Sequence, residues 1–481
     1  MGRVSCGAIY LLIYIISSIL YNIFLHPLRK YPGPKLWAIS RIPYSLAWLS
    51  GQGHKKILDL HLRYGDIVRV APDALVFNYP DAWTDLMGHR SRGQSENGKD
   101  PDFWKDHSHA MIAANREDHG RMRKVLSHGF SAQAMLAQQP LIQNYVTMLI
   151  KKLKAASKTG EAQEMAAWYN WTTFDIIGDL SFGEPFGCLE KTYYHPWVAL
   201  IFDHIKGTAL LAAIRKFPFN DMIVKMMMTK EDKEKYHAHL EMSKASVSKR
   251  LALKVPRLDL LESIARAHEK GAEIMDNVDT MIVGGSETTA TGLSGATYLL
   301  ATNKEVFAKL AEEVRTRFKS EDEIDLLSVQ KLDYMMAVIK ESMRVYPPVP
   351  AAMPRKAPPE GYLLRDGRMI PPNTILGVWQ WPLFHNPNFF KDPESFIPER
   401  WLDDPSFSGD QKAAFEPFST GPRNCIGKNL AYAEMRLILA RIIWNFDLEI
   451  DPRSEGWIDR NEIYLLWEKP DLYVRLVDSG K

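Results

Sequence analysis

Phe418-Ser419-Thr420-Gly421-Pro422-Arg423-Asn424-Cys425-Ile426-Gly427 is the stretch that decides the fold. It reads Phe-x-x-Gly-x-Arg-x-Cys-x-Gly, and apolar residues at helical spacing follow it. A cysteine just before a helix N-terminus receives the helix dipole and free backbone N–H groups, which stabilise a thiolate. Gly421 and Gly427 let the backbone approach whatever the sulfur binds, and Arg423 offers a forked cation suited to a carboxylate. The stretch predicts Cys425 as a thiolate ligand.

A second motif, Gly284-Gly285-Ser286-Glu287-Thr288-Thr289, lies inside a helix-periodic stretch over 273–301. Paired glycines weaken a helix by about 1 kcal/mol each relative to alanine, so we expect a local bulge that opens room for a ligand. The Thr288 hydroxyl can bond the carbonyl four residues back, which belongs to Gly284. Small residues also serve close packing at a helix crossing, and the motif alone leaves both interpretations open.

Two segments have the Glu-x-x-Arg spacing of a helical ion pair, Glu341-Ser342-Met343-Arg344 and Glu312-Glu313-Val314-Arg315. We expect the second to be a solvated pair. Only the first is followed by a proline-rich segment and then by Phe396-Ile397-Pro398-Glu399-Arg400-Trp401.

Together these motifs resemble the cytochrome P450 superfamily, and the resemblance extends along nearly the whole chain. The sequence looks most like the microsomal fungal branch that oxidises secondary metabolites, which includes trichothecene and averantin hydroxylases. The resemblance implies the mainly α fold with small β-sheets of that superfamily. It also implies a heme b, with Cys425 as the axial ligand of the iron and thiolate donation that favours O–O cleavage.

The resemblance further implies roles for individual residues. Thr288 would hydrogen-bond dioxygen, and Glu287 would resupply protons from solvent. Glu341, Arg344 and Arg400 would form a buried triad that holds the cysteine loop, since buried charges are tolerated only when they satisfy one another. Contacts to the heme are expected from Phe418, Arg423, Gly427, His119, Arg123 and Arg355. His119 and Arg123 share one helical face at i, i+4, and the histidine stands where other branches carry tryptophan.

The implied reaction inserts one oxygen atom of O2 into a hydrophobic small molecule and releases the other as water. Because no Gly-x-Gly-x-x-Gly follows a strand, the electrons must come from a partner protein. The resemblance implies that NADPH-cytochrome P450 reductase delivers two electrons from NADPH, with cytochrome b5 as a second candidate donor. Basic residues that could contact an acidic reductase face are Lys124, Lys428 and Arg436. Expected substrate contacts are largely apolar and indicate a lipophilic substrate: 100–115, 200–212, Met281, Ile282, Val349, Pro350 and Ile463.

Two alternatives keep the heme. A heme-thiolate isomerase or dehydratase would not use O2, and the intact Glu287-Thr288 pair argues against it. A non-enzymatic heme ligand sensor would not consume NADPH. A non-heme iron site at His107-x-His109 lacks a matching carboxylate or second histidine pair nearby.

The composition agrees with a large folded enzyme. The 481 residues are 46% hydrophobic, and 60 Lys+Arg against 58 Asp+Glu give a net charge of +2, which disfavours nucleic-acid binding. Three distant cysteines cannot form a disulfide framework and fit a reducing compartment. No linker or repeat divides residues 41–481, which predicts one catalytic domain that acts as a monomer.

The amino terminus is apolar, with no charged side chain between Arg3 and Arg29. An 18-residue apolar run over 8–25 nearly spans a hydrocarbon core of about 30 Å, which predicts a single transmembrane anchor over 1–30. The positive charges that follow predict a cytosolic body on the endoplasmic reticulum membrane. Tyr31-Pro32-Gly33-Pro34 begins a stiff proline-rich hinge over 31–40.

Periodicity predicts the remaining elements. A short hairpin is expected over 65–80, short strands and loops over 347–398, and a terminal hairpin over 458–477. Helices are expected over 118–157, 160–180, 195–215, 221–250, 257–270, 273–301, 304–320, 328–345 and 421–446.

Overall fold

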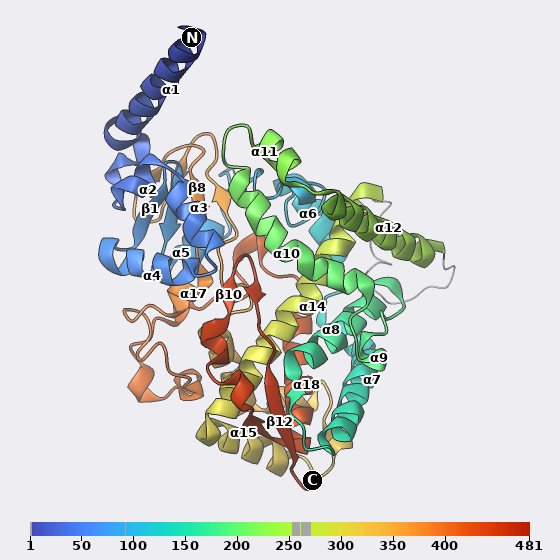
Figure 1. The fold of residues 1–481 in the computed structure, drawn as a ribbon. Coiled ribbons are helices and arrows are strands. Elements are labelled where there is room, and N and C mark those ends of the chain that lie inside the picture. The colour runs from blue at the N-terminus through green and yellow to red at the C-terminus, as the bar shows by residue number, and fades with distance from the viewer. Residues whose placement is uncertain (1, 92, 253–259, 261–270) are drawn as a thin grey trace.

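A computed structural model describes residues 2–91, 93–252, 260 and 271–481. Its central element is the long helix α14 (Gly271–Thr302), which runs through the middle of the molecule beside α8 (Met165–Phe182) (Figure 1). The two helices approach closely at Gly285, where an added Cβ would lie 2.8 Å from Ile177 Cδ1. Close packing is therefore one reason for the paired glycines.

Helices form most of the structure, as predicted. In addition to α8 and α14 they are α1 (Gly2–Leu20), α2 (Lys35–Ile39), α3 (Ile42–Leu49), α4 (Gly53–Tyr64), α5 (Ala82–Met87), α6 (Arg116–Leu126), α7 (Ala132–Ser157), α9 (Cys188–Lys191), α10 (Pro196–Ile214), α11 (Asn220–Met227), α12 (Lys230–Ala252), α15 (Lys304–Arg317), α16 (Asp333–Val345), α17 (Gln380–Phe384) and α18 (Lys428–Asn445).

Two predicted helices are each divided in the structure. The stretch 118–157 breaks between α6 and α7, where the Ser131 hydroxyl accepts a hydrogen bond from Ala134 N at 3.2 Å and starts a new helix. The stretch 221–250 breaks between α11 and α12, where Thr229 and Asp232 cap each other's backbone N–H groups at 2.9 and 3.1 Å. The helix expected over 257–270 lies outside the described residues, apart from position 260.

Short strands form small sheets, as predicted. The five-stranded sheet has the order β1-β2-β8-β5-β3, with β2 and β8 parallel. Its strands are β1 (Ile67–Ala71), β2 (Ala74–Phe77), β3 (Gly98–Lys99), β5 (Arg355–Lys356) and β8 (Ile375–Gly377). The hairpin expected over 65–80 is confirmed, because β1 and β2 pair antiparallel in this region.

The expected terminal hairpin over 458–477 is wrong in part. Its first half is the hairpin of β10 (Glu462–Ile463) and β11 (Trp467–Glu468), but β12 (Tyr473–Asp478) instead lies between β4 (Gln163–Glu164) and β9 (Phe446–Ile450). The last described pair is β6 (Tyr362–Leu363) with β7 (Met369–Ile370). Local alternation of side chains does not identify such distant partners.

The amino-terminal helix α1 projects away from the body in Figure 1. The part of the chain that the structure describes contains no helix long and apolar enough to span a bilayer, so the predicted transmembrane helix is not found there. The α-helix ends at Leu20, because Tyr21–Leu25 form a π-helical turn and His26 is extended.

The segment 31–40, predicted to be a stiff hinge, is bound to the body. The side-chain amide of Asn22 donates to Ile39 O at 3.1 Å, and Arg69 N donates to Pro32 O at 2.8 Å. At Gly33 an added Cβ would lie 2.4 Å from Arg69 O. The proline-rich segment is therefore fastened along β1 through backbone contacts that only a glycine permits.

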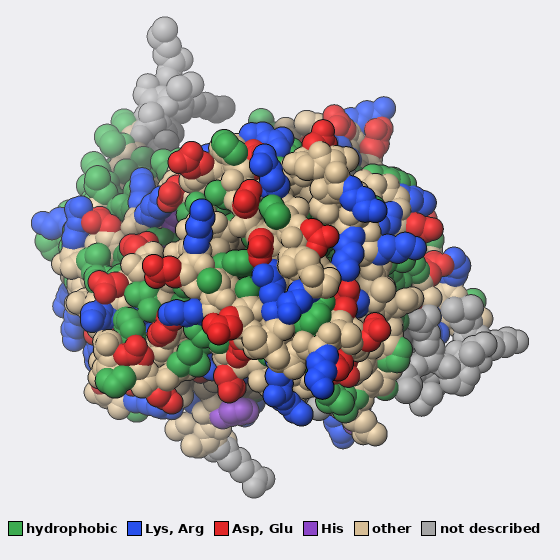
Figure 2. Space-filling model, turned by 90° about the horizontal axis from the view of Figure 1, so that it is seen from below, with side chains coloured by type: hydrophobic (Ala, Val, Ile, Leu, Met, Phe, Trp, Pro, Cys, Tyr) green, Lys and Arg blue, Asp and Glu red, His purple; other side chains and the backbone are tan. Residues whose placement is uncertain are grey.

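The face shown in Figure 2 carries positive and negative side chains interspersed with one another. This mixed distribution agrees with the almost balanced count of basic and acidic residues in the chain.

Candidate active site

Cys425 lies in a loop that leads into α18. The loop is closed by a hydrogen bond from Cys425 N to Phe418 O at 2.9 Å, and Gly427 is the N-cap of the helix. The Cys425 side chain is accessible to solvent, although many protein atoms surround it. Desolvation by these atoms raises the pKa of the thiol, while the Gly427 N–H and the charges of Arg123 and Lys428 lower it. The expected position just before a helix N-terminus is thus present.

The two glycines of this loop differ in what they contact. Gly421 has φ +79°, and an added Cβ would lie 1.9 Å from Met87 O at the end of α5. Gly427 is less constrained, since its nearest contacts would be at 3.9 Å, one of them Cys425 Sγ. The expectation that Gly421 serves approach to a ligand needs correction, because the structure uses it to pack the loop against α5.

Phe418 is half-buried at the start of the loop. Its ring packs against Tyr432 with a centroid distance of 5.0 Å, and the Lys428 ammonium lies 5.7 Å from its centre. Both partners belong to α18. The ring therefore ties the beginning of the loop to the helix that follows Cys425.

A cluster of cationic side chains lies beside this loop. Lys99 and Arg355 face each other across the ladder between β3 and β5, and each lowers the pKa of His119 by its charge, as do Arg123 and Arg423. The structure thus gathers four cations from four distant segments around one histidine. Lys99 was missed by sequence reasoning, because its position depends on a two-residue strand with no local signal.

The arginines of the cluster hold the loop through specific contacts. Arg123 Nη1 donates to Asn424 O at 2.7 Å, one residue from Cys425. Arg423 pairs with Glu96 Oε1 through Nε at 3.0 Å and Nη2 at 2.7 Å, and its Nη1 donates to Ala114 O at 2.9 Å. Glu96 was also missed by sequence reasoning.

Burial and mutual repulsion shift the pKa values in the cluster. Burial, then the charge of Arg423, lowers the pKa of Arg355 to about 10. Burial, followed by the charges of Arg355 and Arg423, holds the pKa of Lys99 well below its usual value. Burial and the surrounding cations lower the pKa of His119 to about 3, so this imidazole is neutral at physiological pH.

These residues fit a heme. The described part of the cluster holds four cations, Lys99, Arg123, Arg355 and Arg423, and one carboxylate, Glu96. The Nε of Arg355 is buried without a hydrogen-bond partner. An excess of buried donors and positive charge suits a ligand with two carboxylates, and the accessible sulfur of Cys425 suits the iron.

The residues of the Gly284–Thr289 motif lie on two different faces of α14. The Thr288 hydroxyl donates to Gly284 O at 2.7 Å, as expected from the sequence. A Cβ at Gly284 would meet nothing within 4 Å, whereas Gly285 packs against α8. Both interpretations of the glycine pair therefore apply, one to each residue. The expected bulge is not present, because α14 stays α-helical through this motif.

Glu287 points elsewhere than Thr288, because neighbouring helix positions are about 100° apart. It is buried, with one carboxylate oxygen in an ion pair with Lys469 and in a hydrogen bond from the Thr291 hydroxyl at 3.2 Å. Lys469 lies just after β11 and was missed by sequence reasoning.

Glu341, Arg344 and Arg400 are in direct contact and fully buried. Arg344 donates to the two oxygens of Glu341 at 2.9 and 3.0 Å, and Arg400 Nε donates to Oε1 at 2.9 Å. Arg400 also pairs with Asp410, which sequence reasoning missed. Two carboxylates thus balance two guanidinium groups inside the protein.

The second Glu-x-x-Arg segment behaves differently, and the expected solvated pair is wrong. Among the described residues Arg315 pairs with Asp447 at 2.7 Å rather than with Glu312, and it donates to the carbonyl oxygens of Ile443 and Phe446. Arg315 therefore satisfies backbone acceptors near the end of α18.

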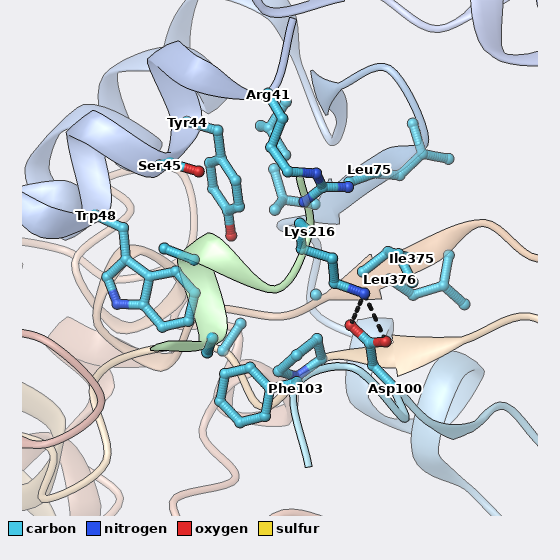
Figure 3. A pocket seen from close by; sticks show the side chains of 18 of the residues that line it. Arg41, Tyr44, Ser45, Trp48, Leu75, Asp100, Phe103, Lys216, Ile375 and Leu376 are labelled. Atoms are coloured by element: carbon cyan, nitrogen blue, oxygen red, sulfur yellow. Dashed lines mark hydrogen bonds and ion pairs between the residues drawn. The ribbon is translucent and has the colours of Figure 1, made fainter. Parts of the chain in front are cut away.

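A small cavity of about 40 Å³ lies between α3, the end of α10 and the five-stranded sheet (Figure 3). Trp48 and Phe103 stack on one side of it with a centroid distance of 5.9 Å. Lys216 binds Asp100 at 2.7 Å on the opposite side. The expected segments 100–115 and 200–212 both contribute to its lining, through Phe103 and Ala212 among others.

The other expected substrate contacts are distributed over separate elements. Ile282, Ile463 and Pro350 are buried, whereas Met281 and Val349 are half-buried. The side chains of residues 201–206 and 208 lie outside the described part of the structure. For the alternative non-heme iron site at His107-x-His109, we find no group of three or more His, Cys, Asp or Glu side chains arranged to bind a metal anywhere among the described residues.

Comparison with known proteins agrees with this geometry. The cytochrome P450 family matches residues 32–475, and the chain belongs to that family. It is 42% identical to trichothecene C-15 hydroxylase of Fusarium sporotrichioides over 474 residues, which cover 97% of this chain and 96% of the relative. It is 41% identical to averantin hydroxylase of Dothistroma septosporum over 484 residues, with 97% and 90% covered. Cytochrome P450 monooxygenase astJ of Aspergillus oryzae is 41% identical over 467 residues, with 95% and 93% covered.

The protein is accordingly a heme-thiolate monooxygenase. Its cofactor is heme, and it uses O2 together with electrons from NADPH that a reductase delivers. The names of the relatives support an oxygenase over the isomerase and sensor alternatives.

Proposed function

We propose that this enzyme inserts one oxygen atom into a hydrophobic secondary metabolite, with Cys425 as the ligand of the heme iron. The observation that carries the proposal is the cationic cluster beside the Cys425 loop, which contains an unpaired buried Arg355 Nε. Two relatives support the substrate class, since they are hydroxylases named for a trichothecene and for averantin.

In this proposal the cluster holds the propionate groups of the heme. Arg355 and Lys99 would each donate to a propionate from the β5–β3 ladder, and the neutral His119 would add an N–H donor. Arg123 fixes the loop through Asn424, and Arg423 is already paired with Glu96. When bound, the heme supplies the oxidative chemistry in which O2 is cleaved and one of its atoms leaves as water.

Thr288 and Glu287 serve proton supply in the proposed function. The Thr288 hydroxyl is held by Gly284 O on the face of α14 where Gly284 leaves open space. While it donates to Gly284 O, the Thr288 oxygen can accept a hydrogen bond. Glu287, one residue away, is the carboxylate that takes part in proton transfer in this proposal.

The lining of the cavity in Figure 3 favours a lipophilic substrate. It contains the aromatic side chains of Tyr44, Trp48, Phe103 and Trp379, together with several aliphatic residues. A mostly apolar lining, which here also includes Arg41, Asp100 and Lys216, is typical of sites for apolar small molecules.

We also propose that the protein is attached to the endoplasmic reticulum membrane with the catalytic domain in the cytosol. Helix α1 and the turn after it carry many exposed apolar side chains, including Ile13, Ile16, Leu20 and Phe24. Helix α11 lies at the same end of the molecule in Figure 1 and exposes Met222 and Met226. Exposed apolar surface gathered at one end of a protein is typical of membrane contact.

The reductase is proposed to dock beside the cysteine loop. Lys428 at the start of α18 and Lys124 on α6 are exposed, and Arg436 is half-buried. Reversing the charge at Lys428 should weaken reductase binding at low salt, since steering between opposite charges is strongest there. Unchanged affinity would contradict this docking face.

The test of the proposed function is the carbon monoxide difference spectrum of the reduced protein. Wild type should show the strongly red-shifted Soret band of thiolate ligation, and Cys425→Ala should lose it. Lipophilic compounds can then be screened by the spectral shift that they cause on binding. A histidine-type band in both proteins would refute the assignment of Cys425.

A further inference from the structure

A buried ion pair joins the carboxy-terminal hairpin to the centre of α14. Lys469 Nζ contacts Glu287 Oε1, and the two side chains are only 6% and 2% exposed. Lys469 Nζ also donates to Thr291 Oγ1 at 2.8 Å, and the Thr291 hydroxyl donates to the same Glu287 oxygen at 3.2 Å. Two groups from two distant segments, Lys469 Nζ and the Thr291 hydroxyl, therefore converge on Oε1 of Glu287.

The second carboxylate oxygen of Glu287, Oε2, differs from Oε1 in its hydrogen bonding. Oε2 is buried and has no hydrogen-bond partner in the described structure. An ionised carboxylate usually accepts hydrogen bonds at both oxygens when it is buried. Oε1 is thus engaged by Lys469 and Thr291, and Oε2 is the atom left to accept a proton.

Lys469 is the ion-pair partner of this buried carboxylate. Burying a charged carboxylate is costly unless a partner pairs with it. Among the described residues Lys469 is the cation within ion-pair distance of Glu287. The negative charge of Glu287 also contributes to raising the pKa of Tyr194 and Tyr346.

The position of Lys469 is set by a rigid support. Trp467, two residues earlier, donates from Nε1 to Pro347 O at 2.7 Å, and its ring stacks on Tyr346 with a centroid distance of 4.3 Å. The β10–β11 hairpin is thereby fastened beside α14 (Figure 1). Packing of Trp467 therefore holds the neighbouring Lys469 ammonium group beside Glu287.

We propose that Lys469 is a positioning residue for proton supply during oxygen activation. It holds Oε1 of Glu287 in the buried ion pair, so that Oε2 is the oxygen left to take up a proton and pass it on. In each transfer Glu287 gains one proton and then loses it, and Lys469 keeps its own protons throughout. The inference rests on the proposed function, in which Glu287 and Thr288 supply protons.

The test uses the holoenzyme with NADPH and its reductase, without added substrate. Reduction of O2 to hydrogen peroxide takes two electrons and two protons, whereas reduction to two waters takes four of each. The peroxide formed per NADPH therefore reports how well protons are supplied. The variants are Lys469→Met, Lys469→Arg, Glu287→Gln and the double variant Lys469→Met/Glu287→Gln. Lys249→Met is the matched control, because Lys249 pairs with Glu184 on the surface.

Lys469→Met and Glu287→Gln should each raise the peroxide yield per NADPH by about threefold or more, a small part of the rate factor that a positioned proton donor supplies. Each should also enlarge the effect of D2O on NADPH oxidation. Lys469→Arg should restore yields near those of wild type, and Lys249→Met should not differ from wild type. The double variant should be no worse than either single variant, because both changes interrupt one path.

The outcomes separate the inference from the function on which it rests. A wild-type peroxide yield in Lys469→Met, with an altered yield in Glu287→Gln, would overturn the role of Lys469. A wild-type yield in Glu287→Gln would overturn the proton path itself, while the carbon monoxide spectrum judges the heme-thiolate assignment independently. If Lys469→Met does not incorporate heme, the double variant decides, because it contains no unpaired buried charge. A double variant with heme and a wild-type yield would also overturn the inference.

Discussion

Glu341 is predicted to be the buried charge on which the stability of the catalytic domain depends most. Its two oxygens accept hydrogen bonds from Arg344 and Arg400 at 2.9–3.0 Å, from Trp401 Nε1 at 2.9 Å and from Ile397 N at 3.1 Å. Glu341→Gln keeps the shape of the side chain but replaces one accepting oxygen with an NH2 group that faces donors. Among the described residues, Asp410 would then remain as the ion-pair partner of this cluster, through Arg400.

The magnitude follows from the burial of this network. Removing one partner of a buried ion pair costs about 3–5 kcal/mol, because the remaining charge stays desolvated. For a domain of about 440 residues, an unfolding entropy of about 2 cal/mol/K per residue amounts to about 0.9 kcal/mol per degree. Glu341→Gln should therefore lower Tm by about 3–6 °C.

Thermal unfolding of the holoenzyme, followed by circular dichroism and by the Soret band, measures this shift. Glu312→Gln is the matched control, because Glu312 is exposed and has the same spacing to its following arginine. Its Tm should stay within about 1 °C of wild type, as for other surface substitutions. Equal shifts in both variants, or a wild-type Tm in Glu341→Gln, would refute the argument from burial.

Four further predictions concern single sites. Gly421→Ala should prevent folding of the cysteine loop and abolish heme incorporation, whereas Gly427→Ala should retain heme; equal heme content in the two purified proteins would contradict the contact geometry. Thr288→Ala should keep heme but divert NADPH to peroxide, and tight coupling of NADPH to product in this variant would exclude the proton role. Burial lowers the pKa of His54 to about 3, below its unfolded value of about 6.5, so its protonation favours the unfolded state; stability should fall by about 1.4 kcal/mol per pH unit below pH 6.5. His54→Phe should flatten the decrease in Tm between pH 7 and pH 5, and an unchanged slope would assign that decrease to other groups. Glu96→Gln removes one negative charge from the cationic cluster and should raise the heme reduction potential in a spectroelectrochemical titration, since positive charge favours the reduced form; an unchanged or lower potential would contradict this.

Local pattern predicted the long elements well. The spacing of apolar residues indicated α14 and α10 to within two residues, because a helix that lies against a core repeats its buried face every three to four residues. The division between α6 and α7 was missed, since the capping serine lies inside an otherwise continuous helical pattern. Periodicity does not register such a local change in backbone direction.

The sequence predicted those residues of the candidate site that lie together in short motifs, and it missed those that depend on partners elsewhere in the chain. Cys425, Thr288 and the Glu341–Arg344 segment lie in compact motifs whose spacing is itself informative. Glu96, Lys99, Asp410 and Lys469 lie in loops or at strand ends. Glu96, Lys99 and Lys469 each act on a partner far away in the chain, and Asp410 pairs with Arg400 ten residues earlier. Only the folded chain reveals these pairs, because a lone charged residue in a loop looks the same whether it is solvated or buried.

Sequence alone therefore identified the family and the mainly helical architecture. It also predicts Cys425 as the thiolate ligand and Glu287 and Thr288 as the residues that serve oxygen activation. Tertiary structure decided which charges meet: Arg423 with Glu96, Arg400 with Asp410, and Glu287 with Lys469. It also decided that Gly284 leaves open space while Gly285 packs against α8. The physical reason is that motifs record constraints within a few turns of chain. Burial and electrostatic pairing, in contrast, depend on distances between segments that only the packed core brings together.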